Sequence, residues 1–419
     1  MTKKTRRIIF LTLLALFLLI APAAILYSQG YRIDLENRKV TNTGGLFLKI
    51  IPKQAEVYLN GTLEKKTDFF FGSILIENLL PRKYQIEIKK DGFYSWQKNL
   101  EIKEREVTEA KNIVLFPQTI NFDVINQGTE SFWFSPDQKK IILKEKEQLG
   151  WALKLYELDK KIKSRLIGET DISLKEADLM NLTFSDDSKK AYLEVGTREQ
   201  IKNFTLEIDK TPAVLTETEP TPPPVEDSLA YKEMNNNDVY YLDETGFLFK
   251  NGEIITSDPF PVKQETEYSL EVFANYIFLK ESDNLYLFNP ESKNFDNFAG
   301  GVNILKVSPD LKKLAYVSNN EIWILFLADT YDQPAKSAGE KVFLVRLSDK
   351  INDLFWITSD HLVFSAGNKI KISEIDNRDG INIVEIAETK TPEIFWSESE
   401  KRLYILTESI LYGSQGLLP

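Results

Sequence analysis

The C-terminal part of the sequence repeats one short unit, and this repeat limits the possible folds more than any other feature. Each copy has an apolar strand ending in Ser or Thr, an acidic turn, a Lys-rich step and a second apolar strand. Two weaker copies lie around residues 228–243 and 271–289. The five clear copies are FWFSPDQKKIILKE (132–145), LTFSDDSKKAYLEV (182–195), LKVSPDLKKLAYVS (305–318), FWITSDHLVFSAG (355–367) and IFWSESEKRLYILT (394–407).

The spacing of these copies, about 40–50 residues, leaves room for four strands per unit, which is typical of a β-propeller. Residues 118–419 would hold about seven such blades. A surplus strand, TINFDVI (119–125), precedes the first full unit, and the last unit ends one strand short. We therefore predict that 119–125 pairs with the last blade as its outer strand and closes the ring, since closure removes an exposed sheet edge.

The SPDxKKLAY pattern with a following IW or LY strand resembles the TolB-like and WD-like propeller repeats of exported bacterial proteins. The resemblance covers most of 118–419 and weakens in 211–300. Two stretches interrupt the repeat. The Pro/Thr/Glu-rich stretch 211–227 is expected to be an exposed loop between blades, with a hinge or a partner-attachment segment as the alternative. The polar stretch 328–341 is expected to be an insertion in the fifth blade, on the rim where propellers usually bind.

A smaller β-module precedes the repeats, at residues 44–117. Its short runs of β-branched and aromatic residues alternate as strands do, and Asn60-Gly61 and Asp91-Gly92 are hairpin-turn signals. We expect five or six strands, enough for a small β-sandwich. The clearest runs are LFLKIIP (46–52), EVYLN (56–60), SILIENL (73–79), YQIEIKK (84–90) and VTEAKNIVLF (107–116).

This module resembles a PEGA domain. The resemblance rests on GLFL (45–48), on IPKQAEVYLNG (51–61), and on LPRKYQIEI (80–88) followed by KDGF (90–93). The naming motif survives only as Pro52 and Ala55, and Arg82 stands where the family usually has glycine. The resemblance implies a β-sandwich surface module of bacterial or archaeal envelopes. It implies no enzyme activity and transfers no ligand site.

The N-terminus carries an uncharged apolar run from Ile8 to Tyr27, long enough as a helix to span a bilayer's hydrocarbon core. The preceding KKTRR cluster favours a cytoplasmic stub (1–7), a transmembrane signal anchor (8–27), a juxtamembrane segment (28–43) and an extracytoplasmic body. The open alternative is a signal peptide cleaved after Ala23, where Ala21-Pro22-Ala23 supplies small residues.

Composition removes several function classes. The chain has no cysteine and a single histidine, which excludes disulfides, cysteine nucleophiles and cysteine zinc sites. The net charge is −11, and because the first seven residues carry +4, the remainder carries −15. An acidic body repels a phosphate backbone, so we expect no nucleic-acid partner.

The residues that could form a site are explained more simply by structural roles than by chemical ones. Asp137, Asp187, Asp310 and Asp360 recur at one place in the repeat, where aspartate stabilises a tight turn, and we expect them on the blades' outer turns, too far apart to share one ion. The tryptophans of the innermost strands are expected to pack between blades rather than to stack on sugars. The single histidine is expected to be a turn or strand-start residue. These last residues are Trp133, Trp356, Trp396 and His361.

The sequence therefore predicts an all-β protein with one N-terminal transmembrane helix, a PEGA-like sandwich (44–117) and a propeller (118–419). We predict no catalytic, cofactor-binding or metal-binding residues and no small-molecule cofactor. The expected function is a membrane-anchored surface binding or scaffold protein of the cell envelope, whose partner is an envelope protein or polymer. The alternative is a propeller glycoside hydrolase or lyase acting on an envelope or extracellular polysaccharide, which a pair of carboxylates in the central channel would favour.

Overall fold

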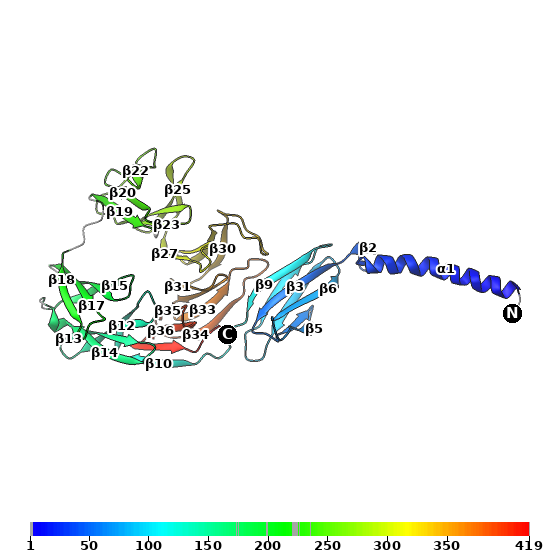
Figure 1. Ribbon diagram of the computed structural model, residues 1–419, viewed down its shortest axis with the longest axis horizontal. Coiled ribbons are helices and arrows are strands. Elements are labelled where there is room, and N and C mark those ends of the chain that lie inside the picture. Colours follow the sequence, from blue (N-terminus) through cyan, green and yellow to red (C-terminus); the bar gives the residue numbers. More distant parts are fainter. Residues whose placement is uncertain are drawn as a thin grey trace.

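A computed structural model describes residues 3–172, 174, 176–197, 200–219, 225, 227–234 and 236–418. Its one long helix, α1 (Lys3–Ser28), has no buried residue and is long and apolar enough to cross a membrane. The helix extends away from the rest of the chain (Figure 1). A short hairpin follows it, formed by β1 (Tyr31–Asp34) and β2 (Lys39–Asn42).

The end of the helix is tied to the first folded module through Arg32. Its guanidinium lies 3.5 Å from the centre of the Tyr27 ring and donates a hydrogen bond of 2.7 Å to Asn78 Oδ1. Cation–π contacts of this kind are worth about 0.5–1 kcal/mol at exposed sites. They are therefore enough to favour one direction for the helix but not to fix it rigidly.

Residues 44–114 form two sheets that face each other. Strand alternation places one face of each sheet in a shared core, where Leu46, Leu48, Ile86 and Ile88 are among the most buried side chains. One sheet has the order β6-β3-β9, with β3 and β9 parallel, and the other has the order β5-β4-β7-β8. The strands are β3 (Gly44–Ile51), β4 (Glu56–Leu59), β5 (Thr62–Lys66), β6 (Ser73–Leu79), β7 (Lys83–Lys89), β8 (Trp96–Glu101) and β9 (Val107–Val114).

The sandwich has seven strands, so the expected five or six was too low. The missed strands are β5 and β8. β5 is fully exposed along its length, so it carries no apolar alternation that a sequence pattern could reveal. The Asn60-Gly61 turn was predicted correctly: both residues have positive φ, 49° and 80°, and they join β4 to β5.

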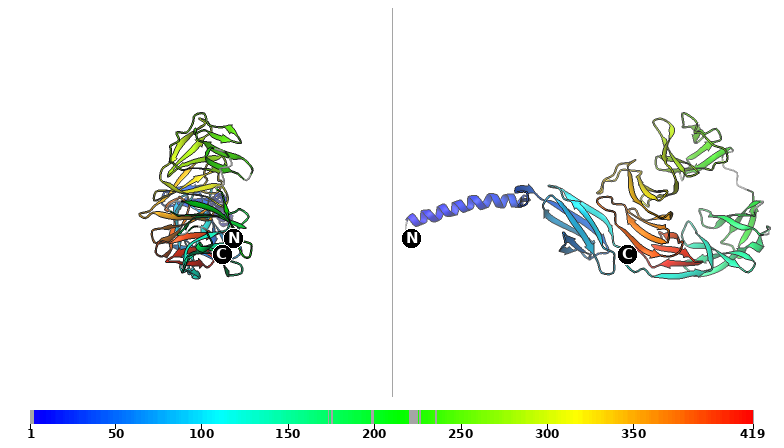
Figure 2. Two further views of the ribbon diagram at one scale, coloured as in Figure 1. Left: turned by 90° about the vertical axis from the view of Figure 1, so that its left-hand side faces the viewer. Right: turned by 180° about the vertical axis from the view of Figure 1, so that it is seen from behind.

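Beyond the sandwich, the described residues form seven four-stranded antiparallel sheets arranged around a centre in a propeller-like fold (Figures 1 and 2). In six of them the strands follow chain order. The first two are β11 (Thr129–Phe134), β12 (Lys140–Glu147), β13 (Gly150–Glu157), β14 (Ile162–Gly168), and β15 (Asp178–Phe184), β16 (Lys190–Gly196), β17 (Ile201–Glu207), β18 (Val214–Thr218), separated by a 3₁₀ turn at Glu169–Asp171.

The next sheets continue this order. They are β19 (Ser228–Glu233), β20 (Val239–Asp243), β21 (Leu248–Lys250), β22 (Glu253–Ile254); β23 (Tyr268–Phe273), β24 (Tyr276–Glu281), β25 (Asn284–Asn289), β26 (Asn294–Ala299); β27 (Val302–Val307), β28 (Lys313–Ser318), β29 (Glu321–Phe326), β30 (Lys341–Arg346); and β31 (Ile351–Thr358), β32 (His361–Ala366), β33 (Lys369–Glu374), β34 (Ile383–Glu388).

The last sheet joins two distant parts of the chain. Its order is β10-β37-β36-β35, so β10 (Phe122–Gln127) from the start of the region pairs antiparallel with β37 (Ile410–Ser414) at its end. The other members are β36 (Arg402–Thr407) and β35 (Glu393–Ser397). The pairing predicted from the surplus strand is thereby confirmed, and it covers the outer edge of the last repeat.

Hydrophobic clusters join every pair of neighbouring sheets except one. Six clusters each draw residues from two adjacent sheets. Among the described residues, no cluster links sheet β15–β18 to sheet β19–β22, and the two sheets stand apart in Figures 1 and 2. Within the described residues, the predicted closure of the ring is therefore seen where β10 pairs with β37, but no hydrophobic cluster closes it between β15–β18 and β19–β22.

The sequence encodes this opening. A strand between two packed neighbours is buried on both faces, as in β32, where all six residues are buried. Strand β16 instead alternates, with Ala191, Leu193 and Val195 buried and Tyr192 and Glu194 exposed. One face of this sheet packs against β11–β14, and the other is exposed and carries Tyr192, Glu194 and Ile201.

The Pro/Thr/Glu-rich stretch 211–227 is not simply a loop. Val214–Thr218 forms β18, the outermost strand of its sheet, so the loop prediction was wrong for these residues. Their β-branched side chains suit an edge strand, and Pro212 lies just before it, where no ladder hydrogen bond is lost. Residues 220–224 and 226 lie outside the described residues.

We predict that the β10 pairing carries much of the stability of the ring. Ile125 packs into the cluster that joins the last sheet to β11–β14, whereas Val124, its neighbour on β10, is 51% exposed. Ile125→Asp should lower the free energy of unfolding by about 2 kcal/mol or more, because it places a carboxylate against apolar side chains. Val124→Asp should cost less than about 0.5 kcal/mol. Thermal melting of both variants would check this, and equal melting shifts would contradict it.

Candidate functional site

The sandwich and the propeller-like region meet at a buried ion pair. Lys98 Nζ lies 2.7 Å from Glu374 Oε1, and the two side chains are 0% and 6% exposed. Lys98 also donates to the backbone carbonyls of Asp376 (2.7 Å) and Gly380 (2.6 Å). Glu374 in turn accepts from the Trp96 indole N–H at 2.8 Å. The charges are therefore fully surrounded by partners, which a buried pair needs to offset the cost of desolvation.

The same contact covers the open edge of strand β8. The Asn382 side chain exchanges two hydrogen bonds with the backbone of Gln97, each 3.2 Å long, and Asp379 Oδ2 accepts from the Asn99 backbone N–H at 2.9 Å. Side chains of the β33–β34 loop thus take the place of a neighbouring strand. An edge strand that would otherwise expose unpaired backbone groups is satisfied within the chain.

An apolar layer lies beside the polar contact. Phe116 is buried, and Tyr94 packs with it against Val363, Ile372 and side chains of β34. The Tyr94 hydroxyl donates to the Glu385 carbonyl at 2.7 Å. His361 faces Phe116 edge-on, with ring centres 5.6 Å apart. The junction therefore combines apolar burial with a satisfied ionic network and holds the two modules in one orientation.

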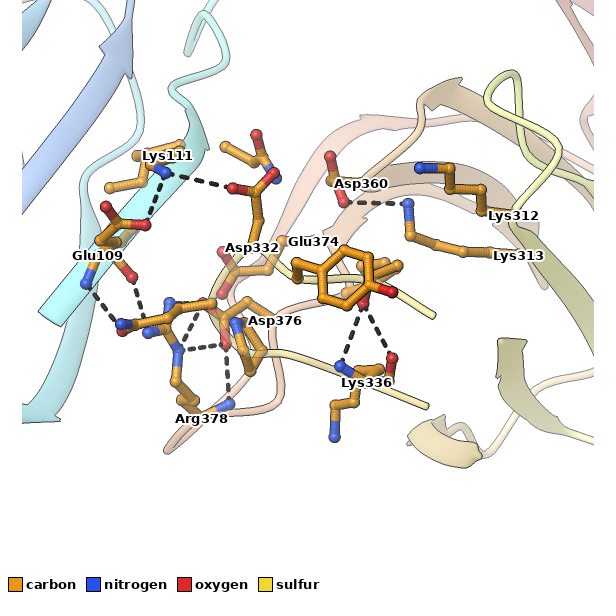
Figure 3. A pocket seen from close by; sticks show the side chains of 18 of the residues that line it. Glu109, Lys111, Lys312, Lys313, Asp332, Lys336, Asp360, Glu374, Asp376 and Arg378 are labelled. Carbon is orange, nitrogen blue, oxygen red and sulfur yellow. Dashed lines mark hydrogen bonds and ion pairs between the residues drawn. The ribbon is translucent and has the colours of Figure 1, made fainter. Parts of the chain in front are cut away.

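A cleft of ≈ 430 Å³ opens next to this junction, between β9, the loop 328–341 and the sheets β27–β30 and β31–β34 (Figure 3). Its walls are mostly charged, and most of these charges are paired. Lys111 lies 2.6 Å from Glu109 and 3.2 Å from Asp332. The remaining ion pairs are Arg378–Asp376 at 2.6 Å, Lys313–Asp310 at 2.9 Å, Lys313–Asp360 at 3.4 Å and Lys336–Glu340 at 2.6 Å.

The loop 328–341 joins β29 to β30, as predicted, but its contacts are with the sandwich rather than with a free rim. Gln333 donates to the Val107 carbonyl at 3.0 Å and accepts from the Glu109 N–H at 2.9 Å. Arg378 also reaches the Glu109 carbonyl, at 2.8 Å. The cleft is thus a second zone of contact between the modules. Most of the charges that line it, among the described residues, are neutralised by one another.

A second pocket lies at the centre of the ring, and we call it the channel pocket. Its volume is ≈ 480 Å³, and its walls come from β11, β15, β31 and β35, the first strands of four sheets. First strands of neighbouring sheets, such as β31 and β35, pack directly against each other, so they are the innermost strands. The acidic and aromatic residues of its lining include Trp133, Phe134, Phe184, Asp353, Phe355, Glu393 and Phe395.

Two carboxyl groups face this pocket. Asp353 Oδ2 accepts from the Ile394 backbone N–H at 3.0 Å and from Ser365 Oγ at 3.4 Å. Within the described part of the chain, the Glu393 carboxyl has neither a hydrogen bond nor an ion pair. Burial by surrounding protein and the nearby Asp353 raise the pKa of Glu393 to about 7, although its side chain is exposed at the pocket. Burial also raises the pKa of Asp353.

The aspartates of the repeat form turns, as expected, but on inner rather than outer turns. Asp137 Oδ1 accepts from Ser135 Oγ (2.6 Å) and from the Lys139 N–H (3.1 Å), and Asp187 and Asp310 repeat this geometry. These turns join the innermost strand of a sheet to the next strand, because the Ser-Pro-Asp or Ser-Asp-Asp segment follows directly on the innermost strand. At Asp360, Thr358 replaces the serine, and the carboxylate pairs with Lys313 of the neighbouring sheet instead.

The lysine of the same segment links adjacent sheets, which the sequence analysis missed. Lys313 Nζ donates to the Ser359 carbonyl at 2.9 Å, and Lys140 Nζ donates to the Ser188 carbonyl at 3.0 Å. In both cases the acceptor lies in the acidic turn of the next sheet. The recurrence of lysine at a fixed place in the repeat was the available signal.

The tryptophans each pack in a cluster that joins two neighbouring sheets, as expected. Trp356 and Trp396 are buried, and Trp356 donates to the Lys306 carbonyl at 2.8 Å, whereas the Trp396 N–H has no partner within the described residues. Trp133 is only partly buried and lines the channel pocket. His361 begins β32, as predicted, and burial lowers its pKa to about 4. No cluster of three or more His, Cys, Asp or Glu suited to a metal ion occurs among the described residues.

Comparisons with known proteins leave the family open. No protein-family model matches the chain, and no curated protein matches it. Solved structures match in shape at low similarity. The β-propeller domain of Cps50 (Swd1) from Myceliophteria thermophila shares 12% identity over 71% of this chain and 99% of that chain, with a TM-score of 0.43. A catalytically inactive virginiamycin B lyase from Staphylococcus aureus, crystallised with quinupristin, shares 16% identity over 70% and 98%, with a TM-score of 0.42.

We predict that the buried junction pair is far more important for stability than the ion pairs of the cleft. Lys98→Ala should destabilise the protein by about 3–5 kcal/mol, because it leaves the Glu374 carboxylate buried without its cation. The matched change Lys111→Ala, at a partly exposed pair, should cost less than about 1 kcal/mol. Thermal melting together with hydrogen exchange of β8 would measure both effects. Similar losses for the two variants would contradict the prediction.

Proposed function

We propose that the chain is a membrane-anchored recognition platform of the cell envelope. In this proposal α1 is an uncleaved signal anchor, the sandwich is a PEGA-like stalk, and a seven-bladed propeller carries the binding surface. The proposal assigns the N-terminus to the cytoplasm and the body to the outside. The partner is an envelope protein or an envelope polymer.

The buried junction is the observation that carries this proposal. A flexible tether would let the propeller-like region take any orientation, whereas the Lys98–Glu374 network and the apolar layer around Phe116 allow one. The sandwich strands β3 and β9 run from the helix end toward the junction, so the modules stand in series (Figure 1). A rigid series of anchor, spacer and ring is suited to presenting a surface at a set distance from a membrane.

A glycoside hydrolase or lyase is the second candidate function. The observation in its favour is the carboxyl pair Asp353 and Glu393 in the channel pocket, with the pKa of Glu393 raised to about 7. A carboxyl group that keeps its proton near neutral pH can act as a general acid beside an ionised partner. Purified full-length protein and its Asp353→Asn and Glu393→Gln variants, incubated with envelope polysaccharide, would separate the two candidates. New reducing ends or unsaturated ends that both variants fail to produce would favour the enzyme.

We predict the topology of the anchor as follows. The chain has no cysteine, so single introduced cysteines report their own location without background. A membrane-impermeant maleimide applied to intact cells should label Ser292→Cys, which is exposed in the body, and should label Thr5→Cys only after the cells are permeabilised. Labelling of Thr5→Cys in intact cells would reverse the assigned orientation.

The same variants test the cleavage alternative. A signal peptide cut after Ala23 would remove residue 5 from the mature protein and shorten the chain by 23 residues on a gel. Retention of the Thr5→Cys label at full length, after permeabilisation, is the result expected for an anchor. Its loss, together with release of the protein into the medium, would overturn the membrane-bound platform.

A further inference from the structure

We propose that the channel pocket is a binding site for a cationic side chain, the ammonium of lysine or the guanidinium of arginine, on a basic segment of a partner protein. The inference rests on the proposed recognition function and deepens it, because it assigns that function to one place in the ring and to one class of ligand. Three observations support it: the two carboxyl groups in the pocket, the aromatic rings of its walls and the net negative charge of the body.

The first observation is a local excess of negative charge without a matching cation. Asp353 and Glu393 come from the adjacent innermost strands β31 and β35, and they are close enough for the charge of one to oppose ionisation of the other. Elsewhere in the described structure, buried or half-buried carboxylates such as Glu145, Glu281 and Glu374 each have a lysine within 2.9 Å. Glu393 is exposed at the pocket and has no lysine partner among the described residues, so an external cation can reach it.

The second observation is the set of rings around these carboxyls. Phe134 and Phe395 stack with their centres 4.0 Å apart, and Phe355 meets Phe395 edge-on at 5.5 Å. Aromatic faces attract ammonium and guanidinium groups, and more strongly where water is displaced. The chain already uses this contact beside the pocket, where Lys306 Nζ lies 4.9 Å from the centre of the Phe355 ring.

Lys306 lies near the pocket, but it does not supply the cation that the two acids lack. It acts on Asp353 from β27 and offsets part of the rise that burial causes in the pKa of that carboxyl, but it forms no ion pair with either acid within the described residues. Asp353, on the packed strand β31, is therefore the charged group that acts on Glu393, and Lys306, on β27, acts on Asp353. A bound cation would complete the site by taking the position between the acids that Lys306 does not occupy.

Long-range charge favours the same ligand. The chain after the first seven residues carries a net charge of −15, so it attracts basic segments and repels acidic ones. The lining also includes Ser135, Gln138 and Thr183, whose hydroxyl and amide groups would suit a neutral sugar, but the two carboxyl groups beside the rings favour a cation. A pocket of ≈ 480 Å³ is large enough for a long basic side chain with part of its backbone.

Binding of defined peptides to the full-length protein would test this site. The protein would be held in nanodiscs of zwitterionic lipid, so that the lipid itself attracts no basic peptide. The probes are capped pentapeptides with a central lysine, arginine or glutamate between alanines, followed by calorimetry or by peptide NMR signals. We expect the lysine and arginine peptides to bind and the glutamate peptide not to bind. Glu393→Gln and Asp353→Asn should each weaken binding at least about fivefold.

A matched control and a pH series separate the pocket from general charge effects. Glu398→Gln changes an exposed glutamate in the turn after β35, outside the pocket, and should leave the affinity unchanged. Binding to the parent protein should fall as the pH is lowered from 8 to 6 and Glu393 gains its proton, and this fall should be lost in Glu393→Gln. Equal affinities for parent and Glu393→Gln would overturn the proposal, as would binding of a neutral oligosaccharide in preference to the basic peptides. Because purified protein is used, failure here leaves the membrane topology result untouched.

Discussion

The arrangement of the molecule depends on one buried ion pair. Lys98 lies on the face of β8 that also carries Trp96 and Leu100, so it points into an otherwise apolar contact. A lysine there is costly unless a carboxylate meets it, and Glu374 at the end of β33 does so. The requirement is specific: only one placement of the sandwich brings Lys98 to Glu374, Trp96 to the second oxygen of Glu374, and the edge of β8 to Asn382. Apolar surfaces alone could slide past one another, whereas this network cannot.

The ring is built on a different principle from the junction. Each sheet is held to its neighbour by apolar clusters, supported by lysines that reach the acidic turn of the next sheet. The β10–β37 pairing joins the two ends of this series. Among the described residues, the series of clusters is interrupted between β15–β18 and β19–β22, where β16 presents an exposed face. The ring therefore keeps its shape through local contacts and one long-range strand pairing, and it can be open on one side without losing the rest.

Much of this could be predicted from the sequence because the relevant signals are local. The repeat fixes where the sheets begin, the surplus strand at 119–125 predicts the pairing with the last sheet, and Asn60-Gly61 predicts a turn. The failures have physical reasons. β5 lacks alternation because it is an exposed edge, and β18 was hidden by the prolines and acidic residues around it. The contacts of loop 328–341 with the sandwich join residues more than two hundred positions apart, which no single-sequence pattern encodes.

The candidate site could not be predicted from the sequence for the same reason. Asp353 and Glu393 are 40 residues apart, and neither belongs to the conspicuous aspartates of the repeat, which are occupied in turns. They meet only because β31 and β35 are the innermost strands of adjacent sheets. A usable signal did exist, because a charged residue in or at the start of an apolar strand needs a partner charge. Lys98, on the buried face of β8, is another example. In one case the partner charge lies in the same chain and builds a junction. At the centre of the ring the described residues give Glu393 no such partner, and in the site that we propose the cation comes from outside.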